Sequence, residues 1–304
     1  MHQIGTVIKR TREYLGITQE TLSNGICSVE TLSRIENGKH VPNRNHFQAL
    51  MERMGKNGER YLPFLHSNDI DRFNEFESIE KKFFQRKFEE VDILLNSLES
   101  QINMDDSINK QLILRLRTLN DYYSGKIDVR SKRIGLLQAL KYTIPNFNEN
   151  QIASSIYSRY EVRLLCNLAA TYAEEKNFTH SISLFKKLEQ YFSNIKINKE
   201  ELYQEKSLFL SNYAQVLGQF GNTSNALQMN DAGISICLET GEGERLSTFL
   251  YNKGFEMEIY GMNEDSCKKT LLQAYYVAEL YNNQKKMTHI AKHWKEKYGD
   301  DISA

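Results

Sequence analysis

Two short helices joined by a tight turn constrain the N-terminal part of this 304-residue chain. Thr18 and Ser28 belong to the residue types that begin a helix by capping its first backbone amides. Gly25 interrupts the chain between them, because glycine readily adopts the backbone conformations that a helix excludes. The sequence therefore predicts helices over residues 19–24 and 29–37 that cross at a tight turn.

The second of these helices has one apolar face and one free face. Leu32 and Ile35 lie three residues apart and share the apolar face. The free face carries small, polar and basic side chains, namely Val29, Glu30, Ser33 and Arg34. A short helix with such a face fits the major groove of DNA and can read the base edges there. We interpret this segment as a DNA-recognition helix.

Residues 4–45 resemble the helix-turn-helix domain of the Cro/repressor type. Within them, the segment LSNGICSVETLSRIENG has a shortened turn and is similar to peptide-sensing regulators of the Rgg/Rap/NprR/PlcR/PrgX group. The resemblance implies that Arg12 pairs with Glu36 at the end of the recognition helix, as a structural ion pair. It also implies that Gln19 holds a DNA phosphate, the alternative being a solvated side chain at a helix start.

The charge of the N-terminal part suits contacts with DNA. Residues 1–66 carry nine Lys or Arg residues and six acidic residues, whereas the whole chain is balanced at 39 of each. Basic side chains bind phosphates and supply affinity without sequence information. We expect double-stranded DNA as a partner, contacted by Gln19, Ser28, Val29, Glu30, Ser33, Arg34, Lys39 and Arg44.

The composition predicts an all-α protein. The chain has only three prolines, and the alternating pattern typical of strands is absent. The cysteines have no paired CxxC spacing and lie in apolar helical segments, so we expect buried free thiols: Cys27, Cys166, Cys237 and Cys267. No apolar run approaches the ~20 residues of a membrane span, and the N-terminus has no signal-peptide character. We expect a cytoplasmic protein without a membrane partner.

Repeats predict the architecture beyond the N-terminal domain. Residues 164–185, 209–230 and 249–270 repeat the spacing of a tetratricopeptide helix pair. Two weaker pairs precede them at 76–98 and 107–142, and a capping helix at 284–298 follows. Such pairs stack into a curved solenoid because none of them buries its apolar face alone. The prediction is therefore a right-handed solenoid of about five helix pairs.

The predicted domain organisation follows from a polar break at residues 66–69. We assign residues 1–66 to the helix-turn-helix domain, 67–71 to a linker, and 72–304 to the tetratricopeptide-like solenoid. The solenoid is expected to sense a peptide and to form a homodimer, since the N-terminal domain offers little spare apolar surface. We expect the N-terminal domain to be attached at the first repeat, near Arg72.

Three asparagines occupy equivalent places in successive repeats: Asn167, Asn212 and Asn252. In a solenoid such positions line the inner groove, where each carboxamide can donate to and accept from a peptide backbone. The alternative is that each asparagine bonds a neighbouring helix. In the resembled family, groove asparagines hold a short secreted signalling peptide, which favours the peptide-binding interpretation.

Charged and aromatic side chains on the first helices of the repeats are further candidates for peptide binding. Arg115, Arg117 and Arg163 could capture a peptide carboxylate, or could be solvated or packing residues. Tyr251 could line a side-chain pocket, although aromatic residues in such helices are more often part of the core.

No catalytic motif is recognisable, so we expect neither an enzymatic activity nor a cofactor. His289 and His293 have the spacing of a metal-binding pair, but the sequence suggests no third ligand, and we expect no metal site. Two functions remain open. The favoured one is a DNA-binding transcription regulator controlled by a peptide in the groove. The alternative is a Rap-like adaptor or phosphorelay antagonist that binds a protein partner.

Overall fold

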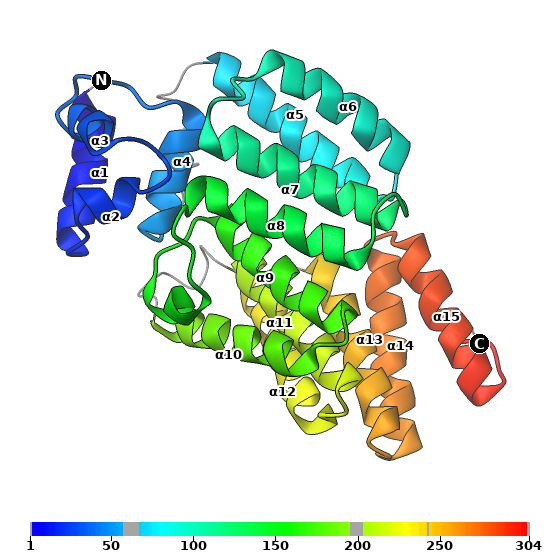
Figure 1. The fold of residues 1–304 in the computed structure, drawn as a ribbon. Coiled ribbons are helices and arrows are strands. Elements are labelled where there is room, and N and C mark those ends of the chain that lie inside the picture. The colour runs from blue at the N-terminus through cyan, green and yellow to red at the C-terminus, as the bar shows by residue number, and fades with distance from the viewer. Residues whose placement is uncertain (1, 57–66, 195–202, 242, 303–304) are drawn as a thin grey trace. The chain divides into compact units, whose positions relative to one another are not determined.

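The computed structural model describes residues 2–56, 67–194, 203–241 and 243–302. These residues form helices and contain no strand, as the composition predicted (Figure 1). None of the helices in the described ranges is both long enough and apolar enough to cross a membrane.

The helices follow one another with short connections. Their bounds are α1 (His2–Tyr14), α2 (Gln19–Ser23), α3 (Val29–Glu36), α4 (Arg44–Arg53), α5 (Ser67–Phe84), α6 (Phe88–Gln101), α7 (Ser107–Tyr123), α8 (Val129–Thr143), the 3-10 helix η2 (Glu149–Ser154), α9 (Arg159–Glu174), α10 (Phe178–Asn194), α11 (Tyr203–Gln219), α12 (Thr223–Thr240), α13 (Gly243–Ile259), α14 (Glu264–Leu280) and α15 (Gln284–Tyr298). From α5 to α14 they make the expected five helix pairs, and α15 is the expected additional helix.

The helices divide between two compact units. The first comprises Met1–Lys176 with Lys187–Glu201, and the second comprises Asn177–Lys186 with Leu202–Ala304. The first unit therefore contains the helix-turn-helix segment together with the first two helix pairs and α9. Helix α4 contacts both α7 and α9. The N-terminal domain therefore packs on helices beyond the first repeat, where we expected it to be attached.

The predicted linker at residues 67–71 forms the first turns of α5. Ser, Asn and Asp, which dominate this segment, begin helices as readily as they interrupt them. The polar composition that suggested a break is thus compatible with a helix start. Residues 57–66, where the predicted boundary falls, lie outside the described ranges.

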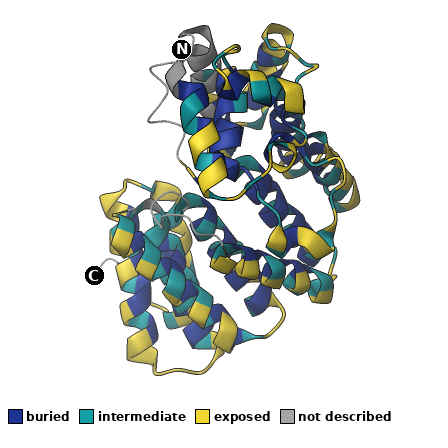
Figure 2. Cartoon of the chain, turned by 90° about the vertical axis from the view of Figure 1, so that its left-hand side faces the viewer, coloured by how far each residue is buried: buried dark blue, intermediate teal, exposed yellow. Residues whose placement is uncertain are grey.

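Buried residues recur along the helices of each unit (Figure 2), and apolar residues make up most of them. In the helix-turn-helix segment, Leu22, Leu32 and Phe47 are completely buried. In the second unit, Ile290 and Trp294 of α15 pack with Leu271 of α14 in one buried cluster. The capping helix is therefore held by its own apolar face.

Three of the four cysteines are buried free thiols, as expected, whereas Cys27 is half-buried. Burial raises the pKa of the Cys27 thiol to about 11, against the opposing charge of Arg53. At neutral pH this thiol is therefore protonated and a poor nucleophile.

Candidate functional site

Two side-chain caps and a glycine turn position the predicted recognition helix. The Thr18 hydroxyl accepts a hydrogen bond from the Thr21 backbone N–H at 3.1 Å, and this begins α2. The Ser28 hydroxyl accepts from the Thr31 backbone N–H at 3.1 Å and begins α3. Between them Gly25 has a φ of 71°, a left-handed conformation that favours glycine.

The faces of α3 are as predicted. Leu32 and Ile35 are buried, while Glu30 and Arg34 are exposed and Val29 keeps 41% of its surface accessible. Ser33 is half-buried on the same helix. The exposed side chains of α3 therefore offer a carboxylate, a guanidinium and an apolar group to a ligand.

A buried ion pair fixes α3 against α1. Arg12 donates from Nε to Glu36 Oε1 at 2.6 Å and from Nη2 to Glu36 Oε2 at 2.8 Å. The hydrogen bond with Glu36 raises the pKa of Arg12, although burial opposes it. Gln19 Nε2 also donates to Glu36 Oε2 at 2.7 Å. An amide nitrogen carries two hydrogens, so this bond orients Gln19 and leaves one donor for a phosphate.

The remaining predicted DNA-binding residues differ in accessibility. Ser28 and Lys39 are exposed at the two ends of α3, although the Ser28 hydroxyl also serves as the helix cap. Arg44 is only 3% exposed. It lies at the start of α4 with its side chain buried, so it is not accessible for the predicted phosphate contact.

Arg53, which the sequence did not single out, connects the helix-turn-helix segment to the helix pairs. Within the segment, its Nη1 donates to the carbonyl oxygens of Leu22 at 3.1 Å and Asn24 at 2.5 Å. Its Nη2 donates to Glu161 Oε1 at 2.7 Å and to the carbonyl oxygen of Thr143 at 3.1 Å. Arg53 is 5% exposed and Glu161 is 1% exposed, so this is a buried ion pair.

Side chains of α4 and of α9 itself cap the N-terminus of α9. Glu161 accepts from the Ser158 backbone N–H at 2.6 Å and from the Thr143 hydroxyl at 2.6 Å. Glu52 of α4 accepts from the Arg159 backbone N–H at 2.9 Å. These bonds satisfy amides that would otherwise be orphaned at a helix start. We call Glu52, Arg53, Thr143, Ser158 and Glu161 the α9 joint.

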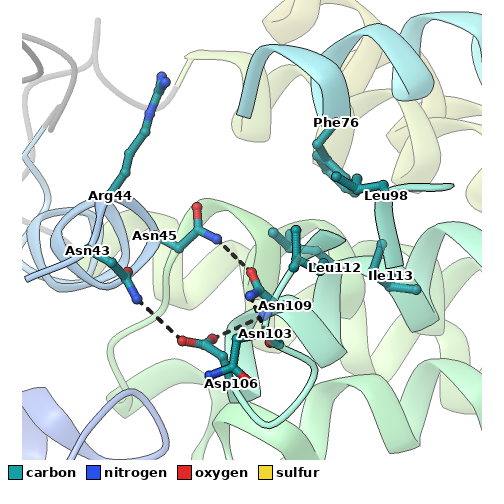
Figure 3. A pocket seen from close by; sticks show the side chains of 11 residues that line it. Asn43, Arg44, Asn45, Phe76, Leu98, Asn103, Asp106, Asn109, Leu112 and Ile113 are labelled. Atoms are coloured by element: carbon teal, nitrogen blue, oxygen red, sulfur yellow. Dashed lines mark hydrogen bonds between the residues drawn. The ribbon is translucent and has the colours of Figure 1, made fainter. Parts of the chain in front are cut away.

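A cavity of about 130 Å³ lies between the start of α4 and helices α5 to α7 (Figure 3). On its polar side Asn45 Nδ2 donates to Asn109 Oδ1 at 2.7 Å, and His46 Nε2 lies 2.7 Å from Asp106 Oδ2. Burial alone would raise the pKa of Asp106, but the hydrogen bond and charge of His46 outweigh it and lower the pKa. These contacts add a second polar connection between α4 and α7.

The three asparagines lie on the first helices of successive pairs, as predicted. Asn167 is on α9, Asn212 on α11 and Asn252 on α13, and all three are half-buried. Asn212 and Asn252 have no side-chain hydrogen bond to any described residue, and the amide nitrogen of Asn167 is buried without an acceptor among them. The carboxamides therefore do not serve to bond a neighbouring helix within the described ranges.

The predicted arginine anchors engage acidic side chains of the first unit. Arg115 is buried and donates to Glu80 Oε1 at 2.6 Å. Arg163 donates to Glu80 Oε2 at 3.4 Å, and Arg117 donates to Glu99 at 2.7 Å. Burial alone would raise the pKa of Glu80, but the charges of Arg115 and Arg163 lower it. Arg115 and Arg117 thus have carboxylate partners within the protein, which disfavours the predicted role of both in binding a peptide carboxylate.

Comparisons with known proteins agree with this description. The model of the RNPP family C-terminal domain matches residues 74–299, and a helix-turn-helix model matches residues 8–60. Comparison with curated proteins gave no match.

Solved structures share the fold at low identity. PlcR of Bacillus thuringiensis, in complex with the peptide PapR7 and DNA, is 18% identical, with a TM-score of 0.63 over 95% of this chain and 99% of that chain. Apo PlcR is 15% identical, with a TM-score of 0.61 over 96% and 99% of the two chains. The apo competence regulator ComR of Streptococcus vestibularis is 14% identical, with a TM-score of 0.52 over 97% and 98%. The model of the RNPP family C-terminal domain covers most of this chain, which therefore belongs to the RNPP family.

Proposed function

We propose that the protein is a DNA-binding transcription regulator controlled by a short signalling peptide that binds along the first helices of its repeats. The observation that carries the proposal is the exposed polar face of α3, held in place by the buried pair of Arg12 and Glu36. Family membership supports it, since the PlcR relative was solved with both a peptide and DNA. Such a regulator acts in the cytoplasm.

The DNA contacts divide into base-reading and phosphate-binding residues. Val29, Glu30 and Arg34 would read bases from the exposed face of α3. Gln19, Ser28, Ser33 and Lys39 would supply the remaining contacts, mostly with phosphates. One recognition helix covers only a few base pairs, so we propose a homodimer on a two-fold symmetric operator.

Replacing Arg34 with alanine is expected to cost about 1–3 kcal/mol of operator binding and to relax specificity at one base pair, because a bidentate base contact is lost. Lys39→Ala should weaken all DNA sequences alike and reduce the salt dependence of binding. The measurement is selection of operators from a random DNA library, followed by anisotropy titration at several salt concentrations. Equal specificity in wild type and Arg34→Ala would exclude Arg34 from base reading.

The peptide site is proposed to include Asn167, Asn212, Asn252 and Tyr251, together with Arg163. The support is the unpaired state of the carboxamides, since a half-buried amide without a partner retains its full capacity to bind a peptide backbone. Arg163 already contacts Glu80, and its contact is the longer of the two arginine bonds to that carboxylate.

Asn212→Ala is expected to weaken peptide binding by about 1–3 kcal/mol, because peptide amide groups would be left unpaired. This corresponds to a loss of roughly 5- to 150-fold in affinity. Calorimetric titration of the signalling peptide measures it. Asn225→Ala is the matched control, because it removes the same side chain from an exposed site on α12. Equal affinity of both variants would make Asn212 a packing residue.

The proposed route of control runs through α9. One end of this helix is capped by Glu52 and by the pair of Arg53 and Glu161, and the helix also carries Asn167. A peptide that prefers one position of α9 would therefore bias the helix-turn-helix segment, by as much as its differential affinity for the two positions.

A further inference from the structure

Helix α15 brings a basic cluster against one tyrosine of α13. The ring of Tyr251 lies 4.9 Å from the ring of His289 and 5.5 Å from that of His293, measured between centroids. The Lys286 ammonium lies 5.6 Å from the centroid of the same ring. Three basic groups of one helix thus surround Tyr251, which immediately precedes Asn252 in the chain.

One of these basic groups has a carboxylate partner within the protein. His293 Nε2 lies 3.0 Å from Glu258 Oε2, and the Tyr298 hydroxyl donates to Glu258 Oε1 at 2.5 Å. Both oxygens of the Glu258 carboxylate are therefore engaged. Glu258 is thus paired with His293 and Tyr298, whereas Nδ1 of His293 is buried without a hydrogen-bond partner among the described residues.

The other side has donors but no acceptor. The Lys286 ammonium, the His289 imidazole and the Tyr251 hydroxyl have no hydrogen bond or ion pair with any described residue. The nearby Glu296 lies 3.7 Å from Lys292. Burial raises the pKa of the Tyr251 phenol, and the charges of Glu258 and Glu296 raise it further. Three donor groups around one ring therefore have no carboxylate partner among the described residues.

The charges around these donors repel one another. Burial lowers the pKa of Lys286, and the neighbouring Lys285 lowers it further. Burial also lowers the pKa of His289, and Lys286, His293 and Lys292 add to the effect. A bound anion would reverse this imbalance, because an opposite charge favours the protonated form of both groups.

A carboxylate matches the donors best. It accepts hydrogen bonds on two oxygens, and ammonium, imidazole and phenol groups are strong donors to it. A metal ion does not match, since no group of three potential metal ligands occurs among the described residues.

We propose that Lys286, His289 and Tyr251 form a carboxylate-binding subsite at the α13–α15 end of the peptide groove. Its ligand is a carboxylate of the signalling peptide, either the C-terminal group or an acidic side chain. The identity of this ligand rests on the proposed function, whereas the affinity of the subsite for carboxylates does not.

The subsite itself is tested with acetate on the full chain. The histidine ring resonances are followed by NMR from pH 5.5 to 8 in sodium acetate and in sodium chloride of equal concentration, about 0.2 M, close to physiological ionic strength. Acetate should raise the pKa of His289 by up to about 1 unit, the lower range for a nearby opposite charge. The exposed His40 of the N-terminal domain should not respond. His289→Gln assigns the resonance.

Matched variants separate the subsite from general surface charge. Lys286→Met removes the ammonium and keeps the apolar stem, so the acetate response of His289 should disappear. Lys285→Met removes an exposed lysine one residue away and should leave the response intact. An unchanged His289 pKa in acetate, or an equal loss in both variants, would overturn the subsite.

Three pools of short synthetic peptides distinguish the two sources of the carboxylate. The first has a free C-terminus and no Asp or Glu, the second has a C-terminal amide and one acidic residue, and the third has neither. Binding is read from Trp294, the single tryptophan of the chain, which lies on α15. The subsite predicts that Lys286→Met weakens one of the first two pools about tenfold and leaves the third unchanged.

The outcomes separate this proposal from the function on which it rests. An acetate response without binding of any pool would support the carboxylate subsite and count against peptide sensing. Peptide binding in which the amidated neutral pool equals the others, with His289 silent to acetate, would overturn the subsite and leave the proposed function standing.

Discussion

Replacing Arg53 with methionine is expected to lower the free energy of unfolding by about 3–5 kcal/mol, the range for removing one partner of a buried ion pair. The loss arises because the Glu161 carboxylate, 1% exposed, would keep its charge without a cation. Two carbonyl oxygens of the helix-turn-helix segment, those of Leu22 and Asn24, would also lose their donor. Equilibrium urea denaturation measures the change.

Arg117→Met is the matched control for this prediction. Arg117 donates to Glu99 at 2.7 Å, the same distance as Arg53 to Glu161, but its side chain is 29% exposed and that of Glu99 is 40% exposed. An exposed pair contributes about 0.2–1 kcal/mol. If Arg53→Met and Arg117→Met lower the free energy of unfolding by the same small amount, Arg53 does not hold the helix-turn-helix segment to the helix pairs.

A double variant identifies what remains of the α9 joint. Arg53→Met with Glu161→Gln removes both charges, so part of the lost stability should return. The recovery should be incomplete because Glu161 also accepts hydrogen bonds from Ser158 and Thr143. An Arg53 effect that is fully additive with Glu161→Gln would mean that the two residues act independently.

Replacing Gly25 with alanine should detach the turn of the helix-turn-helix segment from α8. A Cβ at Gly25 would lie 1.8 Å from the carbonyl oxygen of Thr143 and 2.3 Å from its carbonyl carbon. Both are backbone atoms, so the clash cannot be relieved by a side-chain rotation. The variant is expected to expose the turn between α2 and α3 and the end of α8, measured as lost protection in hydrogen–deuterium exchange.

Gly16→Ala separates this clash from backbone strain. Gly16 has a φ of 68°, close to the 71° of Gly25, but a Cβ there would meet nothing within 4 Å. In both variants the left-handed backbone conformation of alanine should lower the free energy of unfolding by about 1–2 kcal/mol. Only Gly25→Ala should lose exchange protection at α8. Indistinguishable exchange in the two variants would contradict the close approach of the turn to Thr143.

Local signals made the N-terminal helices and the repeats predictable. Thr18 and Ser28 cap helices by bonding to amides three residues away, a distance over which sequence is directly informative. The spacing of Leu32 and Ile35 predicted which face of α3 is buried, and the structure agrees. The recurrence of Asn167, Asn212 and Asn252 similarly located the first helices of three pairs.

Long-range partners were not predictable from the sequence. Arg53 is held by Thr143 and Glu161, which lie 90 and 108 residues away. Arg115 resembled a groove residue because it lies on the first helix of a pair, yet its partner Glu80 is 35 residues earlier. The one readable signal of the α9 joint was the spacing of Ser158 and Glu161, a capping box at the start of α9.

Operator binding with and without peptide tests the central claim most directly. Purified full-length protein is titrated against operator DNA from the random-library selection, alone and with short synthetic peptides that copy the ends of small secreted proteins encoded beside its gene. The claim predicts a two-fold symmetric operator and one peptide that changes its affinity by about 5- to 150-fold, an effect that Asn212→Ala diminishes. If selection enriches no DNA sequence, or no peptide alters the binding of an enriched one, peptide-controlled DNA binding is contradicted. A solenoid that serves as a protein adaptor would then account better for the fold.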